Sequence, residues 1–324
     1  MKTFRSIGWG FTFIFFTLLC SSSTGQKKVS AFNSLDSITL GILYADTGAY
    51  AKAIALYETI PPGDTNYTLA LLEDAVAKES SGQDSAAIIL CRKGLKLDSS
   101  YTNDFYNLLA TTYIDESHYT DAITTFQKSL DLDKYDPMSH YYLGRCCLEQ
   151  GRLIPALLSL QFYLVLQPQK SHSYSVVQLI EQVTSNKYQY DKAYSVDPSV
   201  YHDSAFIELD LMIRSRIATN KQYKAATSIN YNFVKQLQLF FEELKYVPST
   251  ENYWMENYVP FFTKLEQKNY LEAYLYFILS SVNDPNLQKD FIKNQKEIKR
   301  FAKWADGLFY AEQSRTALPL SKAK

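Results

Sequence analysis

The residue types that most often carry out chemistry are few in this chain and widely spaced. The histidines are His118, His140, His172 and His202. They form no His-Glu-x-x-His pair and show no other metal-ligand spacing. No Gly-x-Ser-x-Gly segment presents a serine nucleophile. We therefore predict that the protein has no catalytic residue, no metal site and no cofactor.

The cysteines and glycines lead to the same prediction. Cys91, Cys146 and Cys147 follow the first 25 residues, and an odd number cannot be fully paired within one chain. Neighbouring side chains on a helix diverge by about 100°, so we expect all three to be small buried residues rather than a redox pair. Only Gly63 and Gly307 lie outside both the first 25 residues and the small-residue positions of the repeat described next, too few for a phosphate-binding loop.

The elements that position these residues recur every 34 residues. Four frames cover residues 34–67, 68–101, 103–136 and 137–170. Position 20 is always alanine, and positions 8 and 15 are always small. Position 20 holds Ala53, Ala87, Ala122 and Ala156. Position 8 holds Gly41, Ala75, Ala110 and Gly144. Position 15 holds Gly48, Gly82, Ser117 and Gly151. Small residues at 8 and 20 let two antiparallel helices approach closely, and the one at 15 suits the turn between them.

This pattern resembles the tetratricopeptide-repeat (TPR) family. Position 24 adds the expected bulk in three copies, with Tyr57, Phe126 and Leu160, although the family's late proline appears only at Pro168. The resemblance implies an all-α fold, a right-handed α-solenoid of stacked antiparallel helix pairs over residues 34–170. It also implies a surface that binds a protein or peptide.

The rest of the chain fits the family less closely. We expect residues 171–203 to connect the repeats to residues 204–315, which we interpret as two TPR-like hairpins and a C-terminal capping helix. Tyr223 and Tyr270 each precede an alanine as in a second TPR helix, and the last helix starts near Pro285. Its lysines suit either a solvated cap or a basic face for anionic lipid or an acidic partner, and thus a peripheral contact with the cell envelope.

Residues 1–25 have the layout of a secretory signal peptide. Lys2 and Arg5 precede the apolar run at 7–20, and small residues follow it. The run is shorter than the roughly 20 residues that cross a bilayer, so we predict cleavage, a periplasmic or secreted protein, and no transmembrane segment in the mature chain. Two alternatives stay open, an uncleaved anchor and a lipid anchor at Cys20.

Charge and composition restrict the kind of partner. The chain of 324 residues carries 33 Lys and Arg against 34 Asp and Glu, so it lacks the basic excess of a nucleic-acid-binding protein. We predict a non-catalytic scaffold for a protein or peptide. The alternative is a protein that binds a small ligand or glycan through its 26 tyrosines.

The TPR resemblance places the partner in a groove lined by the first helix of each repeat. We expect the groove residues to be Asp104, Asn107, Thr111, Tyr141, Arg145 and Glu149, and we expect them to face solvent. In the first two repeats the same wall is apolar, with Leu35, Ile42 and Val76. This apolar part either binds the partner or is covered by residues 26–33 or the C-terminal half. Ile38 and Ile42 replace the Lys and Asn of a carboxylate clamp, so we predict no such clamp.

Overall fold

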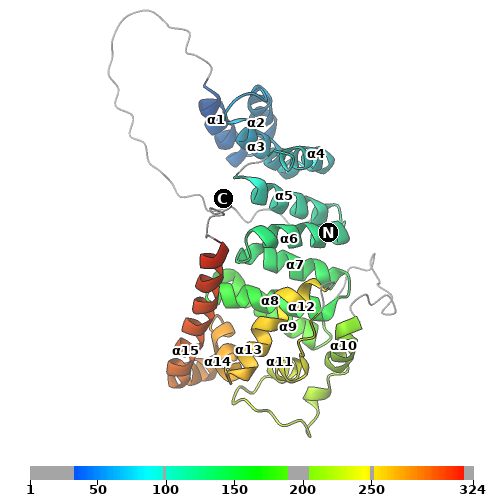
Figure 1. Ribbon diagram of the computed structural model, residues 1–324, viewed down its shortest axis with the longest axis vertical. Coiled ribbons are helices and arrows are strands. Elements are labelled where there is room, and N and C mark those ends of the chain that lie inside the picture. Colours follow the sequence, from blue (N-terminus) through cyan, green and yellow to red (C-terminus); the bar gives the residue numbers. More distant parts are fainter. Residues whose placement is uncertain (1–32, 98–99, 189–203, 249–251, 317–324) are drawn as a thin grey trace, which may run out of the picture.

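The computed structural model describes residues 33–97, 100–188, 204–248 and 252–316 (Figure 1). The predicted signal peptide and Cys20 lie outside these residues. Fifteen α-helices and two short 3-10 helices make up the regular structure of the described chain, which contains no strand. The predicted all-α fold is therefore confirmed.

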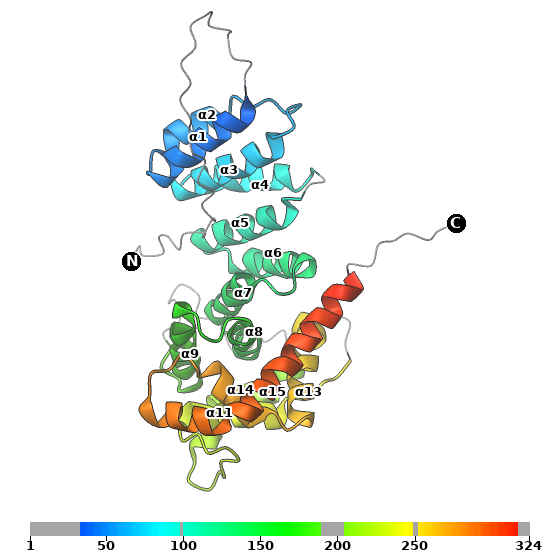
Figure 2. The same cartoon turned by 90° about the vertical axis from the view of Figure 1, so that its left-hand side faces the viewer.

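The four predicted repeats form four antiparallel helix pairs, and each frame begins within one residue of a first helix. The pairs are α1 (Ser34–Asp46) with α2 (Tyr50–Tyr57), α3 (Tyr67–Ser80) with α4 (Asp84–Gly94), α5 (Thr102–Asp115) with α6 (Tyr119–Leu132), and α7 (Pro137–Glu149) with α8 (Leu153–Leu166). Figure 2 shows the pairs stacked one on the next. The predicted α-solenoid is confirmed for this part of the chain.

The small residues of the frame have the roles predicted for them. All four alanines at position 20 are fully buried. A Cβ atom on Gly41 would lie 2.4 Å from Cε1 of Tyr57, so only glycine fits opposite that ring. Position 15 has a positive φ in every repeat, from 60° at Ser117 to 78° at Gly48. This left-handed conformation ends each first helix.

A fifth first helix follows the four pairs, where we had predicted only a connection. Residues 171–184 form α9 (Ser171–Thr184), which ends in the same turn. Asn186 has a φ of 57° and stands 35 residues after Gly151. The backbone nitrogen of Lys187 donates to the carbonyl of Gln182, as that of Arg152 does to Cys147. The remainder of the predicted connection, residues 189–203, lies outside the described chain.

The C-terminal half is only partly built from hairpins. It contains η3 (Ser204–Phe206), α10 (Ile207–Arg214), η4 (Ile217–Thr219), α11 (Asn232–Glu243), α12 (Tyr253–Asn257), α13 (Val259–Gln267), α14 (Leu271–Ile278) and α15 (Pro285–Thr316). The second predicted hairpin is present as α13 and α14, with a turn at Asn269 of φ 55°.

The first predicted hairpin of this half is wrong in its second helix. Residues 223–226 are not helical, and the next helix begins only at Asn232. Gln238 of α11 explains the difference, because its carboxamide bonds to the backbone there. Its Oε1 accepts from the nitrogen of Ala226 at 2.8 Å, and its Nε2 donates to the carbonyl of Lys224 at 3.4 Å. These backbone groups are thus satisfied without a helix.

The two halves meet at α8, of whose 14 residues 13 are buried. A helix that is apolar on all sides requires cover on all sides, and α7 and the C-terminal helices provide it (Figure 1). Two buried polar bonds fix this contact. Trp254 Nε1 donates to Ser159 Oγ at 3.2 Å, and the Tyr274 hydroxyl donates to Gln161 Oε1 at 2.9 Å.

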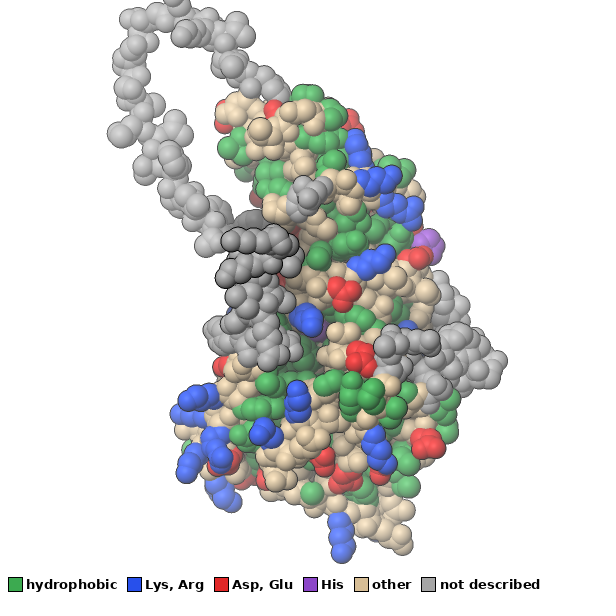
Figure 3. Space-filling model, in the orientation of Figure 1, with side chains coloured by type: hydrophobic (Ala, Val, Ile, Leu, Met, Phe, Trp, Pro, Cys, Tyr) green, Lys and Arg blue, Asp and Glu red, His purple; other side chains and the backbone are tan. Residues whose placement is uncertain are grey.

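The last helix, α15, packs against α14. It buries Leu287, Ile298, Phe301 and Ala305 and leaves its lysines exposed. Figure 3 shows these basic side chains gathered at the lower left, over the α14–α15 end of the molecule. None of the described helices is long and apolar enough to cross a membrane.

Candidate functional site

The first helices form the inner wall of the stack. α1 contacts α3, α3 contacts α5 and α5 contacts α7, each more extensively than the second helices contact one another. Side chains between neighbouring first helices therefore share one continuous surface, which we call the inner wall. It is the surface on which the sequence predicts partner binding.

Asn107 does not face solvent on this wall, contrary to our prediction. It is 8% exposed, and its Oδ1 accepts from the hydroxyls of Ser129 and Ser139 at 2.5 and 2.9 Å. Its Nδ2 donates to Asp136 at 3.4 Å. Because these partners lie on α6, on α7 and just before α7, Asn107 joins two repeats and is a structural residue.

Tyr141 is also buried, at 6% exposure, and is likewise a correction. Its ring packs edge-on against His172 of α9, with centroids 4.4 Å apart, and lies 5.8 Å from the ring of Tyr163. The fifth first helix covers the side of Tyr141 that we expected to be open. Replacing this tyrosine would therefore disturb packing rather than test partner binding.

The other predicted residues lie in two groups on the wall. Arg145 is half-buried and donates from Nη1 to the Tyr141 hydroxyl at 2.9 Å, and Glu149 accepts from the Tyr188 hydroxyl at 2.5 Å. Asp104 and Thr111 are half-buried on α5. The structure therefore joins Tyr141, Arg145 and Glu149 into one cluster near α9.

Four carboxylates, which we call the acidic wall, occupy the inner wall of the second and third repeats. They are Glu73 and Glu79 of α3 and Asp104 and Asp115 of α5. Burial and the charges of Asp46 and Asp104 raise the pKa of Glu73 to about 6. Burial and the charge of Asp115 raise the pKa of Glu79 to about 7.

Burial also raises the pKa of Asp104 and of Asp115, with nearby Asp136 and Asp84 adding to it. Within the described chain, no residue of the acidic wall forms an ion pair with Lys or Arg. The Glu79 and Asp115 carboxyl groups share a hydrogen bond, so a bound proton reduces the charge of this pair at low pH. The negative charge that remains is not neutralised by Lys or Arg of the described chain.

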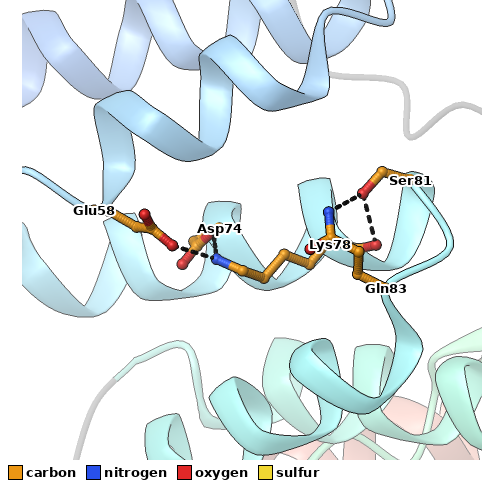
Figure 4. Close-up of polar contacts among 5 residues, drawn as sticks. All are labelled: Glu58, Asp74, Lys78, Ser81 and Gln83. Atoms are coloured by element: carbon orange, nitrogen blue, oxygen red, sulfur yellow. Dashed lines mark hydrogen bonds and ion pairs between the residues drawn. The ribbon is translucent and has the colours of Figure 1, made fainter.

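Asp74, a neighbouring carboxylate on α3, does form an ion pair with a lysine. Asp74 is 6% exposed, and the Lys78 ammonium lies 2.5 Å from its Oδ1 and 2.9 Å from Glu58 Oε1 (Figure 4). In the same view Ser81 donates to the Lys78 carbonyl and accepts from Gln83. α3 thus neutralises Asp74 with its own lysine but leaves Glu73 and Glu79 without one.

Exposed apolar side chains accompany the acidic wall. Leu35 and Ile42 of α1 are 51% and 37% exposed, and Val76 of α3 is 36% exposed. Ile38 and Leu72, at the other predicted wall positions, are buried instead. The open part of the inner wall therefore combines apolar side chains with uncompensated carboxylates.

The histidines and cysteines are poorly placed for chemistry. His140 is buried, and its Nε2 donates to the Lys134 carbonyl at 2.8 Å, which leaves Nδ1 to accept from the Tyr258 hydroxyl at 2.7 Å. Burial lowers the pKa of His140 to about 4 and raises that of Cys91 to about 12. Among the described residues no group of His, Cys, Asp and Glu could hold a metal ion.

Sequence reasoning did not name Glu73 and Glu79 among the groove residues. They occupy positions 6 and 12 of the second frame. The detectable signal was helical spacing, since Glu73 follows Leu69 by four residues and Glu79 follows Val76 by three.

The chain is similar to one protein family and to several solved structures. The family model of anaphase-promoting complex, cyclosome, subunit 3 matches residues 80–162, within the four repeats. No curated protein matches the sequence significantly. Among solved structures, one of MamA protein is 16% identical to this chain and has a TM-score of 0.42. The match covers 66% of this chain and 98% of the MamA chain. The structures MamA MSR-1 and MamA AMB-1 are 17% and 21% identical with TM-scores of 0.38 and 0.37. They cover 56% and 45% of this chain, and 97% and 82% of their own.

Proposed function

We propose that this chain, a TPR-repeat protein, is a non-catalytic scaffold that binds a basic segment of a protein or peptide on its acidic wall. We further propose that it does so in the periplasm or outside the cell, after removal of residues 1–25. Helix-pair solenoids of this kind present extended surfaces suited to protein recognition.

The uncompensated acidic wall carries the proposal. Burial and the neighbouring carboxylates raise the pKa values of Glu73 and Glu79, and neither forms an ion pair with Lys or Arg of the described chain. Lys or Arg side chains of a partner would supply a cation, and Leu35, Ile42 and Val76 would contact its apolar side chains. Arginine beside apolar groups is a favoured composition for binding hot spots.

The state of the reactive residues supports a non-catalytic role. His140 has both ring nitrogens occupied within the core. Cys91, Cys146 and Cys147 are buried, and burial keeps the pKa of Cys91 and Cys146 well above neutral. A thiol in this state is a poor nucleophile.

Capture of partners by matched variants tests the proposed surface. The variant Glu73→Gln, Glu79→Gln, Asp115→Asn removes three wall charges, and Asp131→Asn, Glu208→Gln, Glu266→Gln removes three exposed charges elsewhere. We expect the first variant to bind the captured partner about tenfold more weakly, since each ion pair contributes up to about 1 kcal/mol. The second should bind like the wild type. Equal binding by both variants would refute this surface, and the mass of the protein from envelope fractions would test cleavage after Gly25.

A further inference from the structure

A half-open cavity of about 130 Å³ lies where the fourth repeat meets the C-terminal helices. Its walls come from α6, the connection to α7, α7, α8, α12, α13 and the end of α15. The side chains that decide its chemistry are Lys134, His140, Phe162, Phe261, Lys264 and Phe309. It is separate from the acidic wall and plays no part in the function proposed above.

Aromatic rings form the inside of this cavity. The ring centroid of Phe162 lies 5.4 Å from that of Phe261 and 5.9 Å from that of Phe309. Phe309 also packs against Tyr135, at 4.9 Å. Rings contributed by α8, α13 and α15 therefore pack on one another and form one wall of the cavity, against which the flat apolar face of another ring can lie.

The floor of the cavity is held in place by His140. This side chain donates to the backbone carbonyl of Lys134 and accepts from the hydroxyl of Tyr258, both of which belong to the lining. Its ring also lies 4.7 Å from that of Phe162. The loop with Lys134 and the start of α13 are thus fixed relative to each other before any ligand arrives.

Two exposed lysines give the lining a net positive charge. Lys134 and Lys264 both line the cavity, and neither forms an ion pair within the described chain. Glu256 is the lining carboxylate, and it accepts from the Tyr246 hydroxyl at 3.1 Å. An aromatic chamber could also attract an organic cation, but two lysines against one glutamate favour an anion.

We propose that this cavity is a binding site for a small aromatic carboxylate. The ring of the ligand would lie against the aromatic wall formed by Phe162, Phe261 and Phe309, and its carboxylate would lie at the ammonium groups of Lys134 and Lys264. The size fits one ring, because a cavity of about 150 Å³ in another protein accepts benzene. Aromatic rings and charged side chains share the lining, a combination that suits a ligand with both a ring and a charged group.

Calorimetric titration of the full mature protein with phenylacetate tests this site. We expect saturable binding of phenylacetate, binding of neutral phenylacetamide that is weaker by about fivefold or more, and no binding of acetate or tetramethylammonium. The variant Lys134→Met, Lys264→Met should lose about fivefold or more in phenylacetate affinity. The control Lys289→Met, Lys293→Met removes two exposed lysines of α15 outside the cavity and should bind phenylacetate like the wild type.

A second variant separates loss of the site from loss of folding. Leu308→Trp adds bulk at a half-buried lining residue and should abolish phenylacetate binding while the far-ultraviolet circular dichroism stays that of a folded helical protein. The proposal is overturned if folded wild-type protein does not bind phenylacetate. It is equally overturned if phenylacetamide or tetramethylammonium binds as tightly, or if both lysine pairs have the same effect.

Discussion

The repeats before α8 and the helices after it are held together by different kinds of contact. In the repeats one arrangement recurs, with a fully buried alanine at position 20 of every pair. After α8 the packing contacts between helices do not repeat from one helix pair to the next. Phe301, for example, lies between Tyr274 and Trp304, at ring-centroid distances of 5.7 and 5.9 Å. The first half depends on the close approach of backbones, and the second depends on the bulk of individual aromatic side chains.

The largest effect should come from removing one of these single aromatic contacts. Phe301 is fully buried, so Phe301→Ala should lower the free energy of unfolding by about 3–5 kcal/mol. Urea unfolding monitored by circular dichroism would measure it. The control Leu43→Ala, at a side chain 58% exposed on α1, should change stability by less than about 0.5 kcal/mol. Similar small effects at both positions would contradict the contrast between the halves.

The junction at α8 should respond to pH through His140. Burial lowers the pKa of His140 from 6.5 to about 4, so between these values the unfolded chain binds a proton that the folded chain does not. Stability should therefore fall as pH falls from 6.5 to 4, by at most about 3 kcal/mol.

His140→Gln keeps a donor for the Lys134 carbonyl and an acceptor for the Tyr258 hydroxyl but cannot titrate. The difference in unfolding free energy between wild type and this variant should therefore depend on pH in the same range. A constant difference from pH 7 to pH 4 would show that the buried imidazole does not titrate as described. Asp136 acts on the same group and raises its pKa slightly against the effect of burial.

In the repeats, enlarging an alanine should cost less than removing an aromatic ring. Ala122 and Ala156 are fully buried between paired helices, and leucine at either position would force the helices apart. We expect Ala122→Leu and Ala156→Leu each to lower the free energy of unfolding by about 1–3 kcal/mol. Unchanged denaturant midpoints for both variants would mean that close backbone approach does not hold the repeats together.

The same contrast explains which parts of the fold could be predicted from the sequence. A contact that recurs every 34 residues requires the same residue types at the same spacing, and this period is visible in the sequence. The four pairs and their turns were therefore predictable. The helix α9 shares the turn but lacks the rest of the pattern, since Asp191 stands where position 20 of a fifth frame should be alanine. The loop at 223–226 resembled a helix start, yet the side chain of Gln238, from a later helix, satisfies its backbone.

The candidate site was less predictable for a related reason. Frame positions predict which residues lie on the first helices, but burial of Asn107 and Tyr141 depends on Ser129, Ser139 and His172, which are distant in sequence. Uncompensated charge is harder still to predict. Whether a carboxylate has a partner depends on side-chain direction, as the paired Asp74 and its unpaired neighbour Glu73 show.

The smallest expected effect is a gain in stability rather than a loss, and it concerns Glu79 of the acidic wall. Burial and the charge of Asp115 raise the pKa of Glu79 to about 7 from 4.5, so the folded chain holds a proton there that the unfolded chain releases. This contribution to stability is complete below pH 4.5 and is lost as pH rises through 7. At pH 8 both carboxylates are charged, and Glu79→Gln should stabilise the protein by roughly 0.5 kcal/mol. At pH 5 Glu79 is already protonated, so the variant should gain almost nothing. Paired urea titrations at the two pH values measure this difference, with Glu208→Gln as the exposed control.

A surface kept for binding should be slightly unfavourable when empty. Glu79→Gln should therefore be more stable than wild type at pH 8 and yet bind a basic partner more weakly. Destabilisation at pH 8 would show that Glu79 contributes to the fold and is not held ready for a partner.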